Sequence, residues 1–413
     1  MAPQTCNFMC DGPLAPDEEP LVATDRERRA LRPLPARRRE QAWMGLVSGR
    51  ERGLSAALAR GGLWVLAVFY RIGLAVVNLR LRLPGGVRRI ARPVLSIGNL
   101  TVGGTGKTPM TALAARLVTE AGGRPVIVSR GYAAPPGGKN EEARELERLA
   151  PGVPVVHGRD RWQAIHDWMW RWPCDVAILD DGFQHRRLAR DLDVVLVDAT
   201  RPFGYGHLLP RGLLRELPAA LARADFVVIT RADLVEPAAL ADLKERVRRS
   251  LARGAQILTA EHRPTAILGA GGKIGPPDVL RGETIAAACG IGNPEAFRAT
   301  LERIGARVAL WEVFPDHWAY SREDVARLAE AARSAGLKWL VTTRKDFVKW
   351  EPILPDQGDR SAVRLVALEV EMAVVEGEEA LRAAVQALLP AVAGKENAEG
   401  RRSPNDESSP KPE

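Results

Sequence analysis

The chain has 413 residues, a net charge of +8, 46% hydrophobic residues and 27% charged residues. This composition is normal for globular proteins, so we expect any disorder to be local and the length to hold about two folded domains. The charge fits phosphorylated substrates, acidic lipids and nucleic acid alike and does not choose among them. The 4 cysteines show no CxxC spacing, which argues against a zinc site or a disulfide framework and favours a reduced, cytosolic location.

Both ends of the chain differ in composition from the middle. Residues 1–45 are rich in Pro, Arg and Glu without apolar periodicity, and residues 393–413 are almost wholly polar. We expect both segments to be disordered. The N-terminal residues also lack a basic start followed by an apolar run, so they do not predict a secretory signal.

A strongly apolar segment, residues 63–83, has Arg71 near its middle and Arg80 and Arg82 near its end. Crossing a membrane requires about 20 mainly apolar residues, and a central arginine costs roughly 2.5 to 3.5 kcal/mol on insertion scales. Further arginines flank the segment on both sides, where they would meet anionic headgroups. The pattern therefore favours a helix that lies in the membrane interface, with a core helix of the soluble fold as the alternative.

Short apolar runs then alternate with helical patterns, which is typical of an α/β fold with a largely parallel sheet. The first domain, residues 46–240, contains runs that predict buried strands at 93–97, 125–129, 176–179, 194–197 and 226–229. The second α/β domain, residues 241–392, has candidate strands near 256–259, 284–289, 307–311, 339–342 and 363–368. In the first domain the polar motifs SRGY, DDGFQH, DATRPFG and TRAD follow successive runs. They fall at the carboxyl ends of strands, the edge where open α/β sheets bind ligands.

The segment TVGGTGKT lies between the first predicted strand and a helix that starts near Lys107. It matches the phosphate-loop pattern GxxxxGK followed by Ser or Thr, except that Thr101 takes the place of the first glycine. The loop glycines can wrap phosphate with backbone amides, Lys107 can reach the β- and γ-phosphates, and the Thr108 hydroxyl can bind Mg²⁺. The residues predicted to bind the nucleotide are Thr101, Val102, Gly103, Gly104, Thr105, Gly106, Lys107 and Thr108.

Two acids, Asp180 and Asp181, end the predicted strand at 176–179. Mg²⁺ binds one or two carboxylates and keeps several waters, so the pair is a candidate metal site. The alternative is a solvated turn, because Asp-Asp-Gly is also good turn chemistry. The phosphate loop upstream in the same sheet favours the metal site.

Other polar side chains are candidates for catalysis or for binding phosphate. His317 lies beside Asp316 and follows a predicted strand, which makes it a candidate catalytic group. Arg161 and Arg215 are candidate phosphate ligands because arginine binds phosphate in a bidentate manner. In a chain with this many arginines, solvated surface is the alternative for each of them.

Taken together, eight ordered blocks resemble the tetraacyldisaccharide 4'-kinase family, the lipid A 4'-kinases. The blocks are GNLTVGGTGKTP (98–109), SRGY (129–132), GRDR (158–161), DDGFQH (180–185), FGYGHLLPRGLLRE (203–216), GIGNP (290–294), FPDH (314–317) and TTRKDFVK (342–349). The resemblance spans about residues 46–390, and a Thr in the first glycine position belongs to this family's own version of the loop. It implies ATP- and Mg²⁺-dependent phosphorylation of the 4'-hydroxyl of a tetraacyldisaccharide 1-phosphate, giving lipid IVA in lipid A biosynthesis.

The resemblance also implies two α/β/α domains, the first similar to a P-loop NTPase, and an N-terminal hydrophobic helix at the cytoplasmic face of the bacterial inner membrane. The implied partners are the lipid A precursor and the membrane surface, and not nucleic acid. Carried over by position, the implied catalytic residues are Lys107, Glu141, Asp181 and His317, the metal ligands Thr108, Asp180 and Asp181, and the substrate contacts Tyr132, Arg161 and Arg215. Glu141 falls where the family's catalytic Asp belongs.

Two alternatives remain open at this point. A P-loop GTPase or metal-insertion chaperone usually has Asn-Lys-x-Asp after a late strand, whereas this chain has TRAD at 230–233. A catalytically impaired nucleotide-binding membrane protein is consistent with Glu141, whose side chain is one methylene longer than that of Asp. A displacement of about 1 Å can cost roughly 100-fold in rate.

Overall fold

The computed structural model describes residues 35–131, 141–354 and 363–389. The chain divides into two compact units. The larger unit consists of Ala42–Ala266, Gly292–Thr300 and Glu369–Glu413, and the smaller unit of Met1–Gln41, Ile267–Ile291 and Leu301–Leu368. The chain therefore passes between the units several times, whereas the sequence suggested a single boundary near residue 240.

The larger unit contains a parallel sheet with the strand order β7-β6-β5-β1-β4-β2-β3. The strands are β1 (Val94–Asn99), β2 (Pro125–Ser129), β3 (Val155–His157), β4 (Val176–Asp180), β5 (Leu192–Asp198), β6 (Phe226–Thr230) and the first part of β7 (Gln256–Gly269). Every residue of β1, β2, β4, β5 and β6 is buried. This confirms the prediction of buried parallel strands, whose two faces are both covered by helices.

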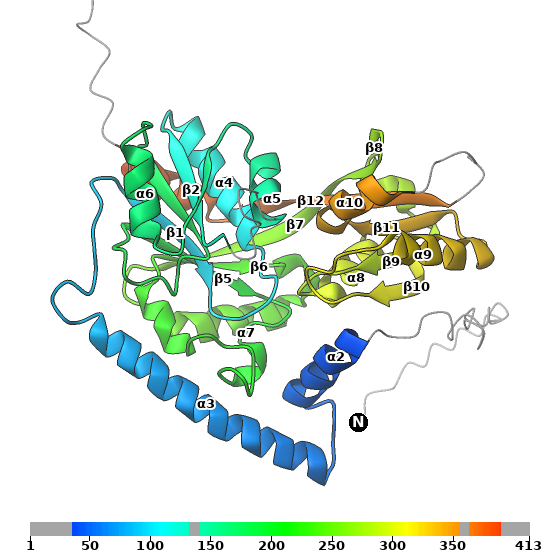
Figure 1. The fold of residues 1–413 in the computed structure, drawn as a ribbon, viewed down its shortest axis with the longest axis horizontal. Helices are drawn as coiled ribbons and strands as arrows, with labels where there is room; N and C mark the ends of the chain where they lie inside the picture. The colour runs from blue at the N-terminus through cyan, green and yellow to red at the C-terminus, as the bar shows by residue number, and fades with distance from the viewer. Residues whose placement is uncertain (1–34, 132–140, 355–362, 390–413) are drawn as a thin grey trace, which may run out of the picture. The chain divides into compact units, whose positions relative to one another are not determined.

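Helices cover both faces of this sheet, so the larger unit has α/β/α layers (Figure 1). On β5, Val194 and Leu196 face a core shared with α4 (Lys107–Glu120), α5 (Glu141–Leu149) and α11 (Glu378–Ala387). Val195 and Val197 face the opposite core, which includes α7 (Pro237–Arg248), and α6 (Arg161–Met169) covers β2 and β4 on that same face. The alternation follows from the two-residue period of a strand.

In the smaller unit four strands of the 12-stranded sheet pair in parallel, with the order β10-β9-β11-β12. Its strands are β9 (Thr284–Cys289), β10 (Arg307–Val313), β11 (Trp339–Thr343) and the first part of β12 (Arg364–Glu376), and β8 (Gly272–Gly275) pairs antiparallel with the end of β7. Its helices are α9 (Arg322–Ser334) and α10 (Arg344–Trp350), while α8 (Pro294–Arg303) begins in the segment that belongs to the larger unit. The smaller unit thus has strands and helices of its own, and its residue ranges differ from the expected 241–392.

Several elements differ from the expectation. Residues 35–45, expected to be disordered, belong to α2 (Pro35–Ser48). Its sequence after Pro35 is rich in Ala, Arg, Glu and Gln, which are strong helix formers, and proline suits the first helical turn. Strands β3 and β8 are short and were not predicted, and β7 and β12 extend well past the predicted 256–259 and 363–368.

The apolar segment forms α3 (Leu54–Arg80), which starts before the predicted residue 63 and ends before the predicted residue 83. It is long and apolar enough to cross a membrane by length and composition, and only 6% of its most apolar window is buried. Only a narrow stripe of the helix faces the larger unit, at positions 56, 60, 63, 67, 70, 74 and 78. All its other residues are exposed.

The exposed side of α3 is apolar. At 100° per residue, the direction opposite the stripe is occupied by Leu54, Leu58, Val65, Val68, Phe69, Ile72, Val76 and Leu79, all of them exposed. The polar contacts with the rest of the unit lie on the stripe, where the Tyr70 hydroxyl donates to the Arg215 carbonyl at 3.1 Å and Arg186 donates to the Asn78 side chain. Arg71 and Arg80 are exposed and lie off the stripe. A surface helix of a soluble protein has the reverse arrangement, with its apolar stripe inward.

Candidate active site

The phosphate loop connects β1 to α4 at the carboxyl edge of the larger unit's sheet. Strands β2, β3 and β4 lie on one side of β1, and strands β5, β6 and β7 lie on the other. The strand order therefore reverses at β1, and open α/β sheets bind ligands at such a point. The phosphate loop follows β1 directly. Gly106 has a left-handed φ of 93° directly before the first turn of α4. A Cβ there would lie 2.8 Å from Met372 Cε and 2.9 Å from His262 Nε2, so only glycine fits.

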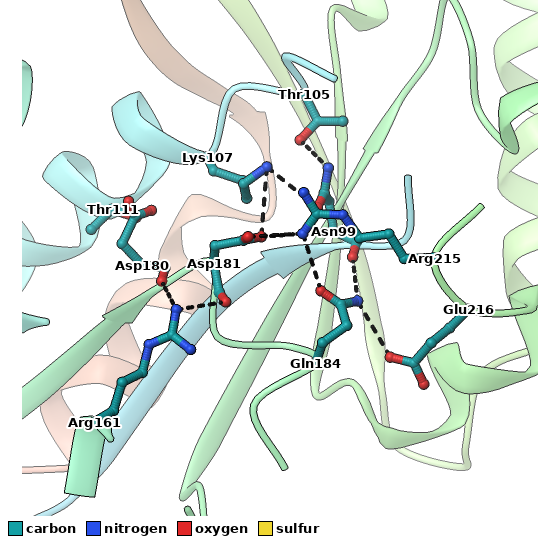
Figure 2. A network of polar contacts seen from close by, with 10 residues as sticks. All are labelled: Asn99, Thr105, Lys107, Thr111, Arg161, Asp180, Asp181, Gln184, Arg215 and Glu216. Atoms are coloured by element: carbon teal, nitrogen blue, oxygen red, sulfur yellow. Dashed lines mark hydrogen bonds and ion pairs between the residues drawn. The ribbon is translucent and has the colours of Figure 1, made fainter. Parts of the chain in front are cut away.

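Lys107 and the loop are held by Asn99 at the end of β1 and by Asp181 directly after β4 (Figure 2). Lys107 Nζ lies 3.4 Å from Asn99 Oδ1 and 3.7 Å from Asp181 Oδ1. The Asn99 amide donates to Thr105 Oγ1 at 2.9 Å, which ties the loop to the end of β1. The ammonium group and the free N-terminal amides of α4 therefore point to one place, a site suited to phosphate.

The two adjacent acids have different surroundings. Asp180, at the end of β4, is only 5% exposed and accepts a hydrogen bond from the Thr111 hydroxyl at 3.0 Å. Burial raises the pKa of Asp180 to about 6, and the negative charges of Asp181 and Glu142 add to the effect. No ion pair joins Asp180 to another side chain in the described part of the chain.

Asp181, in contrast, already has cationic partners. Arg215 Nη1 donates to both carboxylate oxygens of Asp181, at 2.9 and 2.8 Å. Burial by itself raises the pKa of Asp181, but Lys107 and Arg215 outweigh it and hold the pKa below its usual value. The two acids that the sequence predicted together thus differ: the pKa of Asp181 is lowered by Lys107 and Arg215, and the pKa of Asp180 is raised by burial.

Two further side chains fix the turn that carries these acids (Figure 2). Arg161 is buried and donates Nη2 to the carbonyl oxygens of Asp180 and Asp181, at 3.0 and 3.2 Å. Gln184 donates its amide to the Asn99 carbonyl at 2.9 Å. The sequence did not single out Thr111, Gln184 or Asn99, although the last two fall within the quoted blocks GNL and DDGFQH.

A divalent cation fits the donors found here. Asp180 offers a buried carboxylate whose pKa is raised chiefly by burial, and the Thr108 hydroxyl lies in the first turn of α4. Mg²⁺ binds in this way, through one or two carboxylates or hydroxyls with phosphate and water as the other ligands. The described residues contain no group of three or more His, Cys, Asp and Glu able to hold a metal by themselves.

The remaining predicted residues lie in different places. Glu141 is half-buried and is the first residue of α5 in the larger unit. His317 belongs to the smaller unit, follows β10 with a left-handed φ of 61°, and has Nε2 3.9 Å from Asp316 Oδ1. Tyr132 lies outside the described residues. The pairing of Glu141 with His317 stays a prediction.

The family model described as tetraacyldisaccharide-1-P 4'-kinase matches residues 60–390. The chain belongs to this family. A tetraacyldisaccharide 4'-kinase of Anaeromyxobacter dehalogenans (strain 2CP-C) is 42% identical over 316 residues, covering 72% of this chain and 82% of the relative. The protein of the same name from Syntrophus aciditrophicus (strain SB) is 40% identical over 339 residues, covering 75% and 88%.

A solved structure of the tetraacyldisaccharide-1-P 4'-kinase family has the same fold. It is LpxK from Aquifex aeolicus in complex with ATP, with a TM-score of 0.59 and 26% identity, covering 80% of this chain and all of that chain. The resemblance deduced from the eight sequence blocks is therefore confirmed, as is the P-loop NTPase-like α/β fold. The GTPase and metal-insertion alternatives are not supported.

Proposed function

We propose that this chain transfers the γ-phosphate of ATP to the 4'-hydroxyl of tetraacyldisaccharide 1-phosphate, giving lipid IVA in lipid A biosynthesis. The observation that carries the proposal is the grouping of Lys107, Asp180 and Asp181 at the carboxyl edge of one sheet, next to a phosphate loop. Membership of the kinase family supports the choice of acceptor. ATP use is supported by the ATP complex of the related structure.

In this mechanism the loop amides and Lys107 hold the β- and γ-phosphates, and Thr108 and Asp180 would hold Mg²⁺. The bound ion would offset negative charge on the phosphate oxygens. Lys107 does the same from the protein side, and Asp181 with Arg215 fixes the position of the lysine. In-line attack forms the bond between the 4'-oxygen and the γ-phosphorus, and the bond to the bridging oxygen of ADP breaks.

Glu141 is the proposed acceptor of the proton that leaves the 4'-hydroxyl, with His317 adjusting its charge. Glutamate can do this work in place of aspartate because the two carboxylates have similar basicity. Among the proposed substrate contacts, Arg215 engages Asp181 only through Nη1, which leaves its second terminal nitrogen for a phosphate oxygen. The proposed contribution of Arg161 is indirect, because it donates to the carbonyls of the Asp-Asp turn.

We also propose that the enzyme works at the cytoplasmic face of the inner membrane, with α3 lying in the membrane interface. The many exposed apolar side chains of α3 support this location. Basic residues at both ends of the helix, Arg50 and Arg52 before it and Arg80 and Arg82 at its end, would bind anionic headgroups. A lipid acceptor would then be presented at the surface where the kinase is held.

The catalytic assignment is tested by measuring ATP-dependent phosphorylation of the disaccharide with single variants. We expect Glu141→Gln to lower kcat by about 100-fold or more, because a general base contributes roughly 10²–10⁴-fold. His317→Ala should lower kcat less, and Glu141→Asp should retain activity. Glu379→Gln is the matched control, because it neutralises an exposed acid at the first turn of another helix of the larger unit. Unchanged rates in both Glu141→Gln and His317→Ala would overturn the assignment.

A further inference from the structure

Arg231 approaches the phosphate loop from a strand that the mechanism does not use. It directly follows β6, has a left-handed φ of 55° and is only 9% exposed. Its guanidinium forms an ion pair with Asp198 through Nη1 and donates Nη2 to the carbonyl oxygen of Gly104 at 2.8 Å. A non-glycine residue in this backbone region is strained, so the tertiary contacts of the side chain must hold it there.

Asp198, at the end of β5, is the centre of a small buried network. Its Oδ1 accepts from the Thr200 backbone N–H at 3.0 Å and from the Thr200 hydroxyl at 2.7 Å. Its Oδ2 accepts from Arg231 and, at 2.9 Å, from the Asn293 amide. Asn293 belongs to the GIGNP block, and its Oδ1 accepts from the Ala296 N–H at 3.3 Å in the first turn of α8. Both ends of the Arg231 guanidinium are therefore fixed.

The backbone of the GIGNP block also packs against the loop. A Cβ at Gly292 would lie 2.5 Å from the Gly104 nitrogen and 3.2 Å from Gly103, so no side chain fits. Thr230, the last residue of β6, donates its hydroxyl to the Thr105 carbonyl at 3.0 Å. Successive carbonyls of the loop, those of Gly104 and Thr105, are thus bound by residues 231 and 230.

Binding of these carbonyls determines where the loop amides point. In a trans peptide the C=O and N–H point in opposite directions. Because Arg231 holds the Gly104 carbonyl, the N–H of the same peptide, that of Thr105, points away from Arg231, and it donates to the Gly103 carbonyl at 3.1 Å. Amides oriented before the ligand arrives bind phosphate without the cost of ordering the loop.

We propose that Arg231, oriented by Asp198 and Asn293, is a positioning residue that sets the amides of the phosphate loop for ATP. The inference rests on the proposed function for the identity of the ligand. Arg231 does not touch the phosphates and acts through the Gly104 carbonyl. It also gives the TRAD and GIGNP blocks, which carry no catalytic side chain, a shared part in the nucleotide site.

The test is the affinity of the full-length, detergent-solubilised protein for ATP with Mg²⁺, measured by calorimetry without the lipid acceptor. The main variant is Arg231→Met combined with Asp198→Asn, which removes the ion pair without leaving a buried charge. We expect its ATP affinity to fall about tenfold or more, with one cooperative thermal transition retained and the KM for the disaccharide unchanged. Arg231→Lys should be intermediate, because a lysine has no fork to bind Asp198 and Gly104 together.

The matched control is Arg190→Met combined with Asp193→Asn. This removes another buried arginine–aspartate pair, 3.2 Å long, near the opposite end of the same strand β5. The control should bind ATP like the parent. ATP affinity within twofold of the parent in the Arg231 variant, or an equal loss in both double variants, would overturn the proposal. A parent that binds ATP but does not phosphorylate the disaccharide would instead contradict the proposed function.

Discussion

At the scale of single residues, neighbouring acids have opposite roles because their surroundings differ. Asp181 has Lys107 and Arg215 beside it, whereas Asp180 is buried at the end of β4 with a pKa raised to about 6. The sequence could predict the pair, because two acids ended an apolar run. It could not predict the division, since Arg215 lies 34 positions away from Asp181. This difference in surroundings is the basis for proposing Asp180 as the direct ligand of a cation.

His185, in the same DDGFQH block, gives a prediction for the pH dependence of stability. It is half-buried, and in the described part of the chain its Nε2 has no hydrogen-bond partner. Burial lowers the pKa of His185 to about 4, and the positive charges of Arg161 and Arg190 add to this. His185 is protonated near pH 6.5 in the unfolded chain but only near pH 4 in the folded chain. The free energy of unfolding therefore falls as the pH drops from about 6.5 to about 4.

We expect His185→Gln to remove this contribution. After allowance for partial exposure, the parent should lose about 1 to 2 kcal/mol more of its free energy of unfolding than the variant between pH 7 and pH 4.5. Urea unfolding at the two pH values measures the difference. Parallel loss of stability in parent and variant would show that His185 is protonated normally in the folded protein.

At the scale of elements, α3 has its apolar side turned away from the protein. Its polar contacts, Tyr70 with the Arg215 carbonyl and Asn78 with Arg186, lie on the stripe that faces the larger unit. Composition alone predicted an interfacial helix, but it could not predict which side of the helix would be exposed and which would pack against the protein. The direction of each side chain depends on where the helix packs.

This arrangement predicts the effect of polar substitutions on membrane binding. Replacing Leu58, Phe69 and Val76 by Gln should lower binding to anionic lipid vesicles by about tenfold or more, because each side chain contributes roughly 1 kcal/mol or more when buried in lipid. ATP affinity should not change. The matched control replaces Ile274, Val348 and Val375, which are exposed apolar residues outside α3. Vesicle flotation measures binding, and equal binding by both triple variants would contradict the proposed role of α3.

The elements that sequence reasoning located well were those with strong local signals. The runs at 125–129 and 284–289 coincide with β2 and β9, and the helix after the phosphate loop begins at Lys107 as predicted. Strand β3 has only three residues and β8 contains two glycines, so neither has a clear pattern. The sequence of β7 continues with polar residues after Thr259, and its extension depends on pairing with other strands. Such long-range pairing has no local signature.

At the scale of the whole molecule, the division into units was the least predictable feature. Strands β7 and β12 each begin in one unit and end in the other, and the chain after Glu369 returns to the larger unit. No local sequence pattern predicts that the chain re-enters the larger unit after Leu368. The GIGNP block is an example of these crossings. Its Gly292 and Asn293 belong to the larger unit, as the phosphate loop does, although residues 267–291 and 301–368 on either side belong to the smaller unit.

The most direct measurement of the central claim is phosphoryl transfer by the purified, detergent-solubilised chain. It would be incubated with Mg²⁺, ATP labelled in the γ-phosphate, and tetraacyldisaccharide 1-phosphate, with GTP in a parallel reaction. The account predicts a labelled lipid heavier by one phosphoryl group, with the phosphate on the 4'-oxygen, formed much faster from ATP than from GTP. Binding of ATP without transfer to the lipid, or equal transfer from GTP, would contradict it.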